Sequence, residues 1–124
     1  MLVVDGANVI GSRPDGWWRD RPGAARRLAG RISSAVYAGR VPAPVILVLE
    51  GRARDGIAEG TDVGVEIVHA VGEGDDTIAR LVASNVACGH EVTAVTADRE
   101  LARRVRSAGG EVVGPNWLLD RLPG

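Results

Sequence analysis

Acidic residues follow four predicted strands of this 124-residue chain, at the point where each strand ends. The strands are short apolar runs at 2–4, 44–51, 65–71 and 91–97. In an open α/β sheet, ligands bind beyond the carboxyl ends of the strands, and the sequence therefore predicts one acidic rim there. Its members are Asp5 and Asn8 after the first strand, Glu50 at the end of the second, Glu73, Asp75 and Asp76 after the third, and Asp98 and Glu100 after the fourth.

Each of these acids also has a purely structural interpretation. Asp98 and Asp75 stand where N-caps of the following helices are expected. Asp76 stands one helical turn before Arg80 and is placed to pair with it. Asp5 precedes a glycine, as in an ordinary turn. None of these roles, however, requires an acid at every strand end.

Taken together, the acids favour a metal site. Close carboxylates repel one another, and their pKa values rise unless a cation lies between them. A hard divalent cation with oxygen ligands, Mg²⁺ or Mn²⁺, relieves that repulsion. The helical pattern puts Asp75 on the inward ridge with Ile78 and Val82, and turns Asp76 about 100° away. We therefore expect Asp75 to be the better ligand of the two.

The elements that position these residues alternate along the chain. A fifth strand is predicted at 111–114, and helices at 22–39, 74–89 and 98–110, with a last helical stretch at 116–122. Asp20 and Pro22 mark the start of the first helix. Residues 11–23 and 51–62 are predicted as loops. Continuous apolar strands that alternate with helices indicate an α/β fold with a parallel sheet covered on both faces.

Composition excludes several kinds of chemistry. The fifteen basic residues are all arginine, which rules out a Walker lysine, a Schiff base and a lysine nucleophile. The single cysteine, Cys88, rules out an intramolecular disulfide and a cysteine-rich zinc site, and we expect it to be buried and inert. His69 and His90 are expected to be structural. No apolar run suits a signal peptide or a membrane span, so we expect a cytoplasmic protein without a membrane partner.

Arginine and tryptophan gather in the loops that follow the first two strands. A net charge of −1 produces no global positive field, so a polyanion would need local arginines at an acidic site. Tryptophan stacks on unpaired bases, although one of the two neighbouring tryptophans could instead anchor its loop. Trp117 lies in an apolar stretch and is expected in the core. The candidate substrate-binding residues are Arg13, Trp17, Trp18, Arg52 and Arg54, with Arg19 and Arg21 beside them.

Four short motifs, in this order, resemble those of the NYN domains, a branch of the PIN-like nuclease superfamily. They are VDGANVIG around Asp5, VLEG around Glu50, EGDD at residues 73–76 and TADRE at residues 96–100. The bacterial YacP-like NYN proteins are the most similar. The chain departs from the pattern in having Glu50 where aspartate is more usual, and in its long, tryptophan-rich loop at 11–23.

The resemblance implies a single PIN-like domain over residues 1–124, built as a three-layer α/β/α sandwich with a mostly parallel central sheet. It also implies a ribonuclease that depends on Mg²⁺ or Mn²⁺ and hydrolyses RNA phosphodiester bonds, and a tendency to form homodimers. The implied core ligands are Asp5, Asp75 and Asp98, with Asn8 positioning a ligand or a water, and with Glu50, Glu73, Asp76 and Glu100 acting directly or through waters.

Other functions remain open at this point. The main alternative is a catalytically idle PIN-like module that binds RNA or a protein, and metal-dependent cleavage of RNA would separate the two. A nucleotide-binding Rossmann-type domain is disfavoured because VVDGANVIG lacks the G-x-G-x-x-G pattern. A receiver-like phospho-acceptor is disfavoured because the chain has no lysine.

Overall fold

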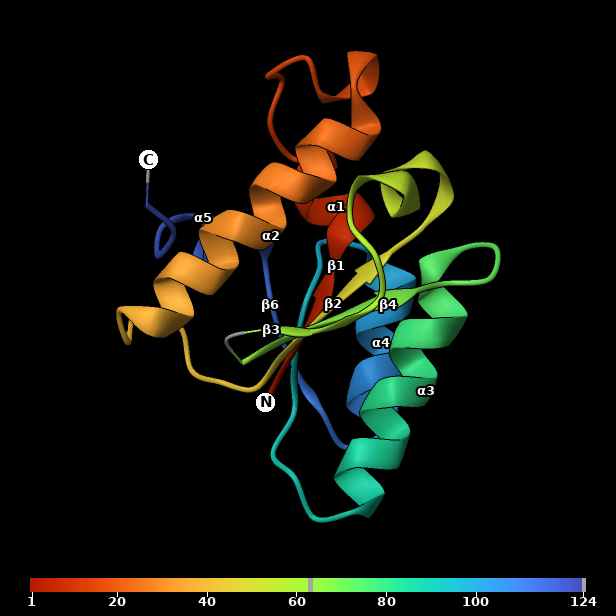
Figure 1. The fold of residues 1–124 in the computed structure, drawn as a ribbon. Coiled ribbons are helices and arrows are strands. Elements are labelled where there is room, and N and C mark those ends of the chain that lie inside the picture. Colours follow the sequence, from red (N-terminus) through yellow and green to blue (C-terminus); the bar gives the residue numbers. More distant parts are fainter. Residues whose placement is uncertain (63, 124) are drawn as a thin grey trace.

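The computed structural model describes residues 1–62 and 64–123 and contains a six-stranded sheet in the order β3-β4-β2-β1-β5-β6 (Figure 1). All neighbouring strands are parallel except β3 and β4, which run antiparallel. The mostly parallel α/β fold expected from the sequence is confirmed. The strands are β1 (Leu2–Asp5), β2 (Val45–Leu49), β3 (Gly60–Asp62), β4 (Val65–His69), β5 (Thr93–Val95) and β6 (Glu111–Val113).

Helices cover both faces of the sheet (Figure 1). Helices α1, α2 and α5 pack on one face, and α3 and α4 pack on the other. The helical segments are α1 (Gly6–Gly11), α2 (Arg21–Tyr37), α3 (Gly74–Ala87), α4 (Arg99–Ser107) and α5 (Pro115–Leu119), with the 3-10 helices η1 (Trp17–Arg19) and η2 (Gly51–Gly56).

The two central strands are apolar on both sides, as the sequence predicts. In β1, Val4 points into the layer with α2, and Val3 points into the layer with α3 and α4. In β2, Leu47 and Val48 divide in the same way. Fully burying one such side chain contributes about 1.5–3 kcal/mol, so both layers are fixed to β1 and β2 by the hydrophobic effect. The site therefore lies at the ends of two strands that are buried along their whole length.

The loop expected at 51–62 contains two elements that the sequence did not reveal. Residues Gly51–Gly56 form η2, and residues Gly60–Asp62 form β3, which adds an antiparallel edge to β4. The three residues of β3 are all exposed and carry no alternating apolar pattern. Periodicity could therefore not identify them. Likewise, the short α1 follows β1 directly, without an apolar repeat long enough to predict it.

Two of the three N-cap residues predicted from the sequence are confirmed, and the third is wrong. Asp20 accepts a hydrogen bond from Gly23 N at 2.9 Å and caps α2, and Asp98 accepts one from Leu101 N at 2.8 Å and caps α4. The expected cap at Asp75 is wrong, because α3 begins at Gly74 and its cap position is Glu73, two residues before Asp75.

Three further expectations concern single residues. The buried thiol expected at Cys88 is wrong, because Cys88 lies exposed at the end of α3. Trp117 packs partly buried against the core, as expected, with the guanidinium of Arg121 3.9 Å from its ring centroid. His69 has a structural contact, since its Nε2 lies 2.8 Å from the carbonyl oxygen of Ile57. Within the described residues, no helix has the length and apolar character needed to span a membrane.

Gly6 allows the chain to turn directly from β1 into α1. A Cβ atom at this position would stand 2.5 Å from the carbonyl oxygen of Val48 and 2.9 Å from the side chain of Leu49. Real Cβ atoms do not approach a backbone oxygen so closely, and the central strand β2 cannot easily move away. At the end of β1, the polar residue Asp5 is therefore followed by a position where the backbone lies so close to β2 that only glycine fits.

The substitution Gly6→Ala is expected to lower the free energy of unfolding by about 2 kcal/mol or more, because it forces α1 away from β2. The matched control is Gly30→Ala on the exposed face of α2, where a Cβ would meet nothing within 4 Å. Alanine there is expected to stabilise the chain by about 0.5–1 kcal/mol. Urea unfolding of both variants measures the two effects, and equal stabilities would contradict the close packing at Gly6.

Candidate active site

Asp5 is the buried carboxylate of the site. It ends β1, the strand between β2 and β5, and only 6% of its surface is exposed. Its Oδ2 accepts a hydrogen bond from Thr96 Oγ1 at 2.9 Å, and its Oδ1 accepts one from Asn8 N at 3.2 Å. Burial nevertheless raises the pKa of Asp5, and the charges of Asp75 and Glu50 raise it further. The two donors satisfy the carboxylate without neutralising its charge.

The loop after β5 is tied to this carboxylate. Thr96 Oγ1 donates to Asp5 and accepts from Asp98 N at 3.1 Å. Asn8 Oδ1 accepts from Ala97 N at 2.7 Å, which fixes α1 to the same loop. This bond uses one lone pair of the Asn8 carboxamide oxygen, so the second lone pair and the NH₂ group remain for contact with a ligand or a water.

Glu50 joins the end of β2 to the start of α3. Its Oε2 accepts a hydrogen bond from Gly74 N at 2.7 Å, so the carboxylate occupies the positive end of the helix dipole. Glu50 is half-buried, whereas Glu73 is exposed and makes no side-chain cap. The second strand end thus delivers an acid to the rim, as predicted, and part of its hydrogen-bonding capacity holds α3 in place.

Asp75 lies among the other acids. It is half-buried, and its pKa is raised first by burial and then by the charges of Asp98, Glu50 and Glu73, while Arg104 opposes the rise. A carboxylate whose neighbours are mostly carboxylates is the arrangement that a divalent cation stabilises. The structure therefore brings Asp75 into the same electrostatic group as Asp5.

Two predicted rim acids point elsewhere. Asp76 is exposed and accepts from Arg104 at 2.9 Å, so its expected pairing with Arg80 is wrong. Asp76 thus pairs with Arg104 on the neighbouring helix α4, and not with Arg80 on its own helix. Glu100 is exposed and pairs with Arg103, whose hydrogen bond lowers the pKa of Glu100. Neither carboxylate takes part in the group around Asp75.

The donor chemistry of the site fits a hard divalent cation, because its ligands are carboxylate oxygens. Among the described residues, no three histidine, cysteine or acidic side chains stand close enough together to hold a metal ion by themselves. Mg²⁺ normally keeps several waters and uses one or two carboxylates, so a partly hydrated ion suits this arrangement. Such an ion would contact one or two of Asp5, Asp75 and Asp98 directly and the others through its waters.

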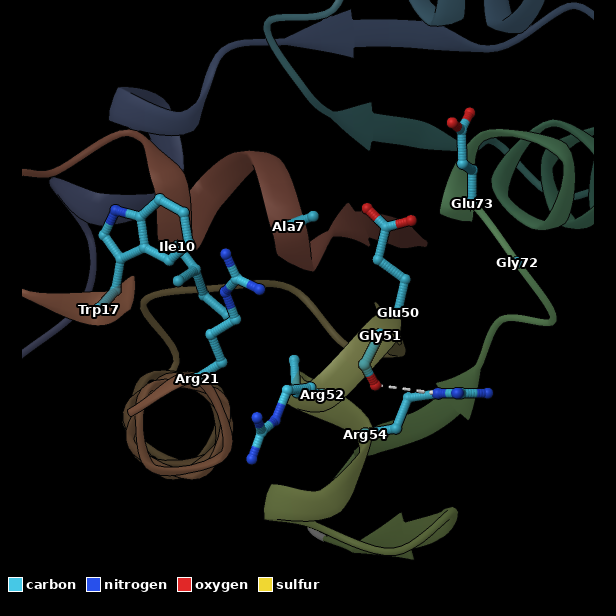
Figure 2. Close-up of a pocket in the computed structure, with 11 residues that line it drawn as sticks. Ala7, Ile10, Trp17, Arg21, Glu50, Gly51, Arg52, Arg54, Gly72 and Glu73 are labelled. Atoms are coloured by element: carbon cyan, nitrogen blue, oxygen red, sulfur yellow. Dashed lines mark hydrogen bonds between the residues drawn. The ribbon is translucent and has the colours of Figure 1, made fainter. Parts of the chain in front are cut away.

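A cavity of about 540 Å³ opens beside the acids (Figure 2). Glu50 and Glu73 lie on its acidic side, and Trp17, Arg21 and Arg52 are also among its lining residues. Figure 2 shows Trp17 and Arg21 on one side and Glu50 and Glu73 on the other. The cavity joins the acidic rim to the arginines and tryptophan of the two preceding loops.

The predicted substrate-binding residues divide between this cavity and other places. Trp17, Arg52 and Arg54 line it, but Arg54 also holds the backbone, donating to Gly51 O at 3.0 Å and to Ala70 O at 3.3 Å. Arg13 does not line this cavity and lies in a separate depression beside α2. Trp18 is half exposed and also lies outside the cavity.

Thr96 is the site residue that sequence reasoning missed. It is buried and hydrogen-bonds both Asp5 and the backbone of Asp98. The signal was present in the TADRE motif, whose first residue is this threonine. The motif does not show, however, that the threonine hydroxyl donates to Asp5, which lies 91 residues away in the sequence.

The raised pKa of Asp5 predicts a pH-dependent difference between the unaltered chain and Asp5→Asn. A carboxyl group with a raised native pKa binds more protons in the folded than in the unfolded state, so its ionisation lowers stability as pH rises from about 3.8 through the native pKa. Asn at position 5 removes this loss. In EDTA, the stability of Asp5→Asn relative to the unaltered chain is therefore expected to increase with pH.

Urea unfolding over a pH series measures this difference, with Asp62→Asn on the exposed strand β3 as the control. The control is expected to follow the unaltered chain at every pH. A constant difference between Asp5→Asn and the unaltered chain would contradict the effect of burial on Asp5.

Solved structures of other proteins share the fold of this chain. No protein-family model and no curated protein matches the sequence. Among solved structures, the crystal structure of a single-substitution variant of Rae1 (YacP) from Bacillus subtilis aligns with a TM-score of 0.72 and 22% identity, covering 96% of this chain and 72% of the other. The crystal structure of Rae1 (YacP) itself gives 0.70 and 22%, covering 97% and 71%. The likeness to YacP-like proteins inferred from the motifs is thus confirmed at the level of the fold, and the chain has the fold of these Rae1 (YacP) structures.

Proposed function

We propose that this protein is a divalent-metal-dependent ribonuclease that hydrolyses RNA phosphodiester bonds at the rim formed by Asp5, Asp75 and Asp98. The observation that carries the proposal is the unneutralised charge of the group: burial and neighbouring carboxylates raise the pKa of both Asp5 and Asp75. A protein that keeps acids in such positions loses stability unless a cation binds them. The fold shared with Rae1 (YacP) supports a nuclease of this kind.

The surroundings of the acids suggest different roles for the aspartates and the glutamates. Asp5, Asp75 and Asp98 would hold Mg²⁺ or Mn²⁺, directly or through waters, and the ion would supply an activated water and neutralise phosphate oxygens. Asp5 is fixed by Thr96 and by the backbone of Asn8, so its orientation is set before any ligand arrives. Glu50 and Glu73 face the cavity side and act on the substrate through waters.

Arginines compensate the repulsion between the acidic rim and a polyanion. Arg21 and Arg52 are exposed at the cavity beside the acids. The guanidinium fork matches phosphate oxygens in two-point contacts, which makes arginine suited to an RNA backbone. Positive charge thus stands next to the acids, where the strand has to approach.

A second candidate function is an idle PIN-like module that binds RNA or a protein. One observation favours it: in the described part of the chain, the acids do not form a group of three around a common point. Such a module would bind no divalent cation and cut no RNA. Metal binding therefore separates the two functions before any substrate is known.

Divalent cations are expected to stabilise the unaltered chain. Binding to the folded state at a concentration about 100 times the dissociation constant contributes about 2.7 kcal/mol. Thermal unfolding with increasing Mg²⁺ or Mn²⁺, compared with Ca²⁺ and EDTA, measures this effect without reference to activity. The Asp5→Asn variant is expected to show no such rise, and a melting temperature of the unaltered chain that is independent of metal would favour the idle module.

The substitution Asp75→Asn is expected to reduce metal-dependent cleavage of RNA by more than about 100-fold, since losing only the partner behind a metal ligand already costs roughly 10–100-fold. Its matched control is Asp76→Asn, the adjacent acid that pairs with Arg104. Cleavage of a mixed panel of RNAs in Mn²⁺ measures both variants, with circular dichroism to check the fold. Full activity in Asp75→Asn would exclude this residue as a ligand.

A further inference from the structure

Trp17 forms one wall of the cavity beside the acidic rim, with its ring held in place. A Cβ added to Gly11 of α1 would stand 3.8 Å from an edge carbon of this ring, so the ring packs over α1. The guanidinium carbon of Arg21 lies 5.4 Å from the ring centroid. Trp17 is half-buried and lines the cavity, so part of its ring meets a ligand there, and a ring already packed loses little side-chain freedom on binding.

The remaining lining is partly apolar and partly charged, and Figure 2 shows Ile10 beside Trp17 and Glu50 farther from it. Ala7, Ile10 and Ala53 supply the apolar surface of the cavity, while the side chains of Arg52 and Glu50 supply charged groups. A volume of about 540 Å³ lies within the range of pockets that enclose small organic groups, roughly 300–1,000 Å³. The cavity therefore suits a flat group with an anionic attachment.

The cavity walls are also preformed. A Cβ on Gly56 would stand 2.0 Å from the carbonyl oxygen of Pro22, which shows how closely η2 packs against the start of α2. Arg26 Nε donates to Gly56 O at 3.0 Å across the same junction. Because α2 carries Arg21 and η2 carries Arg52, this junction fixes the distance between the backbone positions of the two arginines.

We infer that the cavity binds one unpaired nucleobase of the RNA strand, stacked on Trp17, with an adjoining phosphate at the guanidinium groups of Arg21 and Arg52. The inference rests on the proposed ribonuclease function and specifies its substrate. A nucleobase joins a flat aromatic face to an anionic phosphate, which is the combination that Trp17, Arg21 and Arg52 complement. A base inside a duplex would first have to leave its stack and its partner, at a cost of a few kcal/mol. The pocket thus selects single-stranded RNA.

The test uses a fluorescent eight-nucleotide single-stranded RNA and a series in which each position in turn lacks its base. Anisotropy in the Asp75→Asn background measures affinity without cleavage. One abasic position is expected to weaken binding about tenfold, within the roughly 1–3 kcal/mol that base stacking contributes. In the Trp17→Ala variant the intact RNA is expected to bind about tenfold more weakly, and that abasic position to lose its effect.

Trp18→Ala is the matched control, because Trp18 neighbours Trp17 but lies outside the cavity. It is expected to keep affinity within about twofold and to keep the abasic effect. Trp17→Leu retains apolar packing without a π face, so it gives the same loss as Trp17→Ala even if the alanine variant folds poorly. An affinity independent of every base, or an equal loss from Trp18→Ala, overturns the inference.

Cleavage by the unaltered chain is measured separately, which distinguishes the two proposals. Metal-dependent cleavage with affinity independent of every base would keep the ribonuclease and overturn the base pocket. Base-dependent binding that requires Trp17, without cleavage under any metal condition, would keep the pocket and overturn the ribonuclease.

Discussion

A buried carboxylate at the end of the central strand constrains the whole site. Removing an ionised group from water is costly unless hydrogen bonds and a counter-charge compensate it. Here Thr96 and the backbone of Asn8 supply the hydrogen bonds to Asp5. To do so, the loop after β5 and the first turn of α1 must meet over the end of β1, and Gly6 must lie against β2. Satisfying one carboxylate thus determines the path of three chain segments.

The same arrangement leaves electrostatic repulsion in the folded state. Burial raises the pKa of Asp5, and the charges of Asp75 and Glu50 raise it further. Glu50 is kept in place by a hydrogen bond from the first residue of α3. Among the described residues, Arg104 opposes the rise in the pKa of Asp75, and it also pairs with Asp76. The site is therefore well ordered but short of positive charge, which is the condition under which a cation contributes most to stability.

Sequence reasoning succeeded where the determinants are local. The caps at Asp20 and Asp98 and the acids after each buried strand follow from neighbouring residues and from the general geometry of parallel sheets. It failed where tertiary contacts decide. Asp76 pairs across helices with Arg104, and β3 forms only because β4 offers a free edge. The cavity at Trp17 joins loops distant in sequence, so no single motif could describe it.

The position of β1 has a consequence for the order of folding. β1 is central in the sheet but first in the chain, and Asp5 and its donor Thr96 are 91 residues apart. Contacts between distant residues form slowly, because the intervening chain must lose entropy before they can stabilise it. During synthesis, the edge of β1 that pairs with β5 therefore stays unpaired until β5 has been made. The acidic site is completed late, and the half-formed sheet before that point exposes an apolar edge that is prone to aggregate.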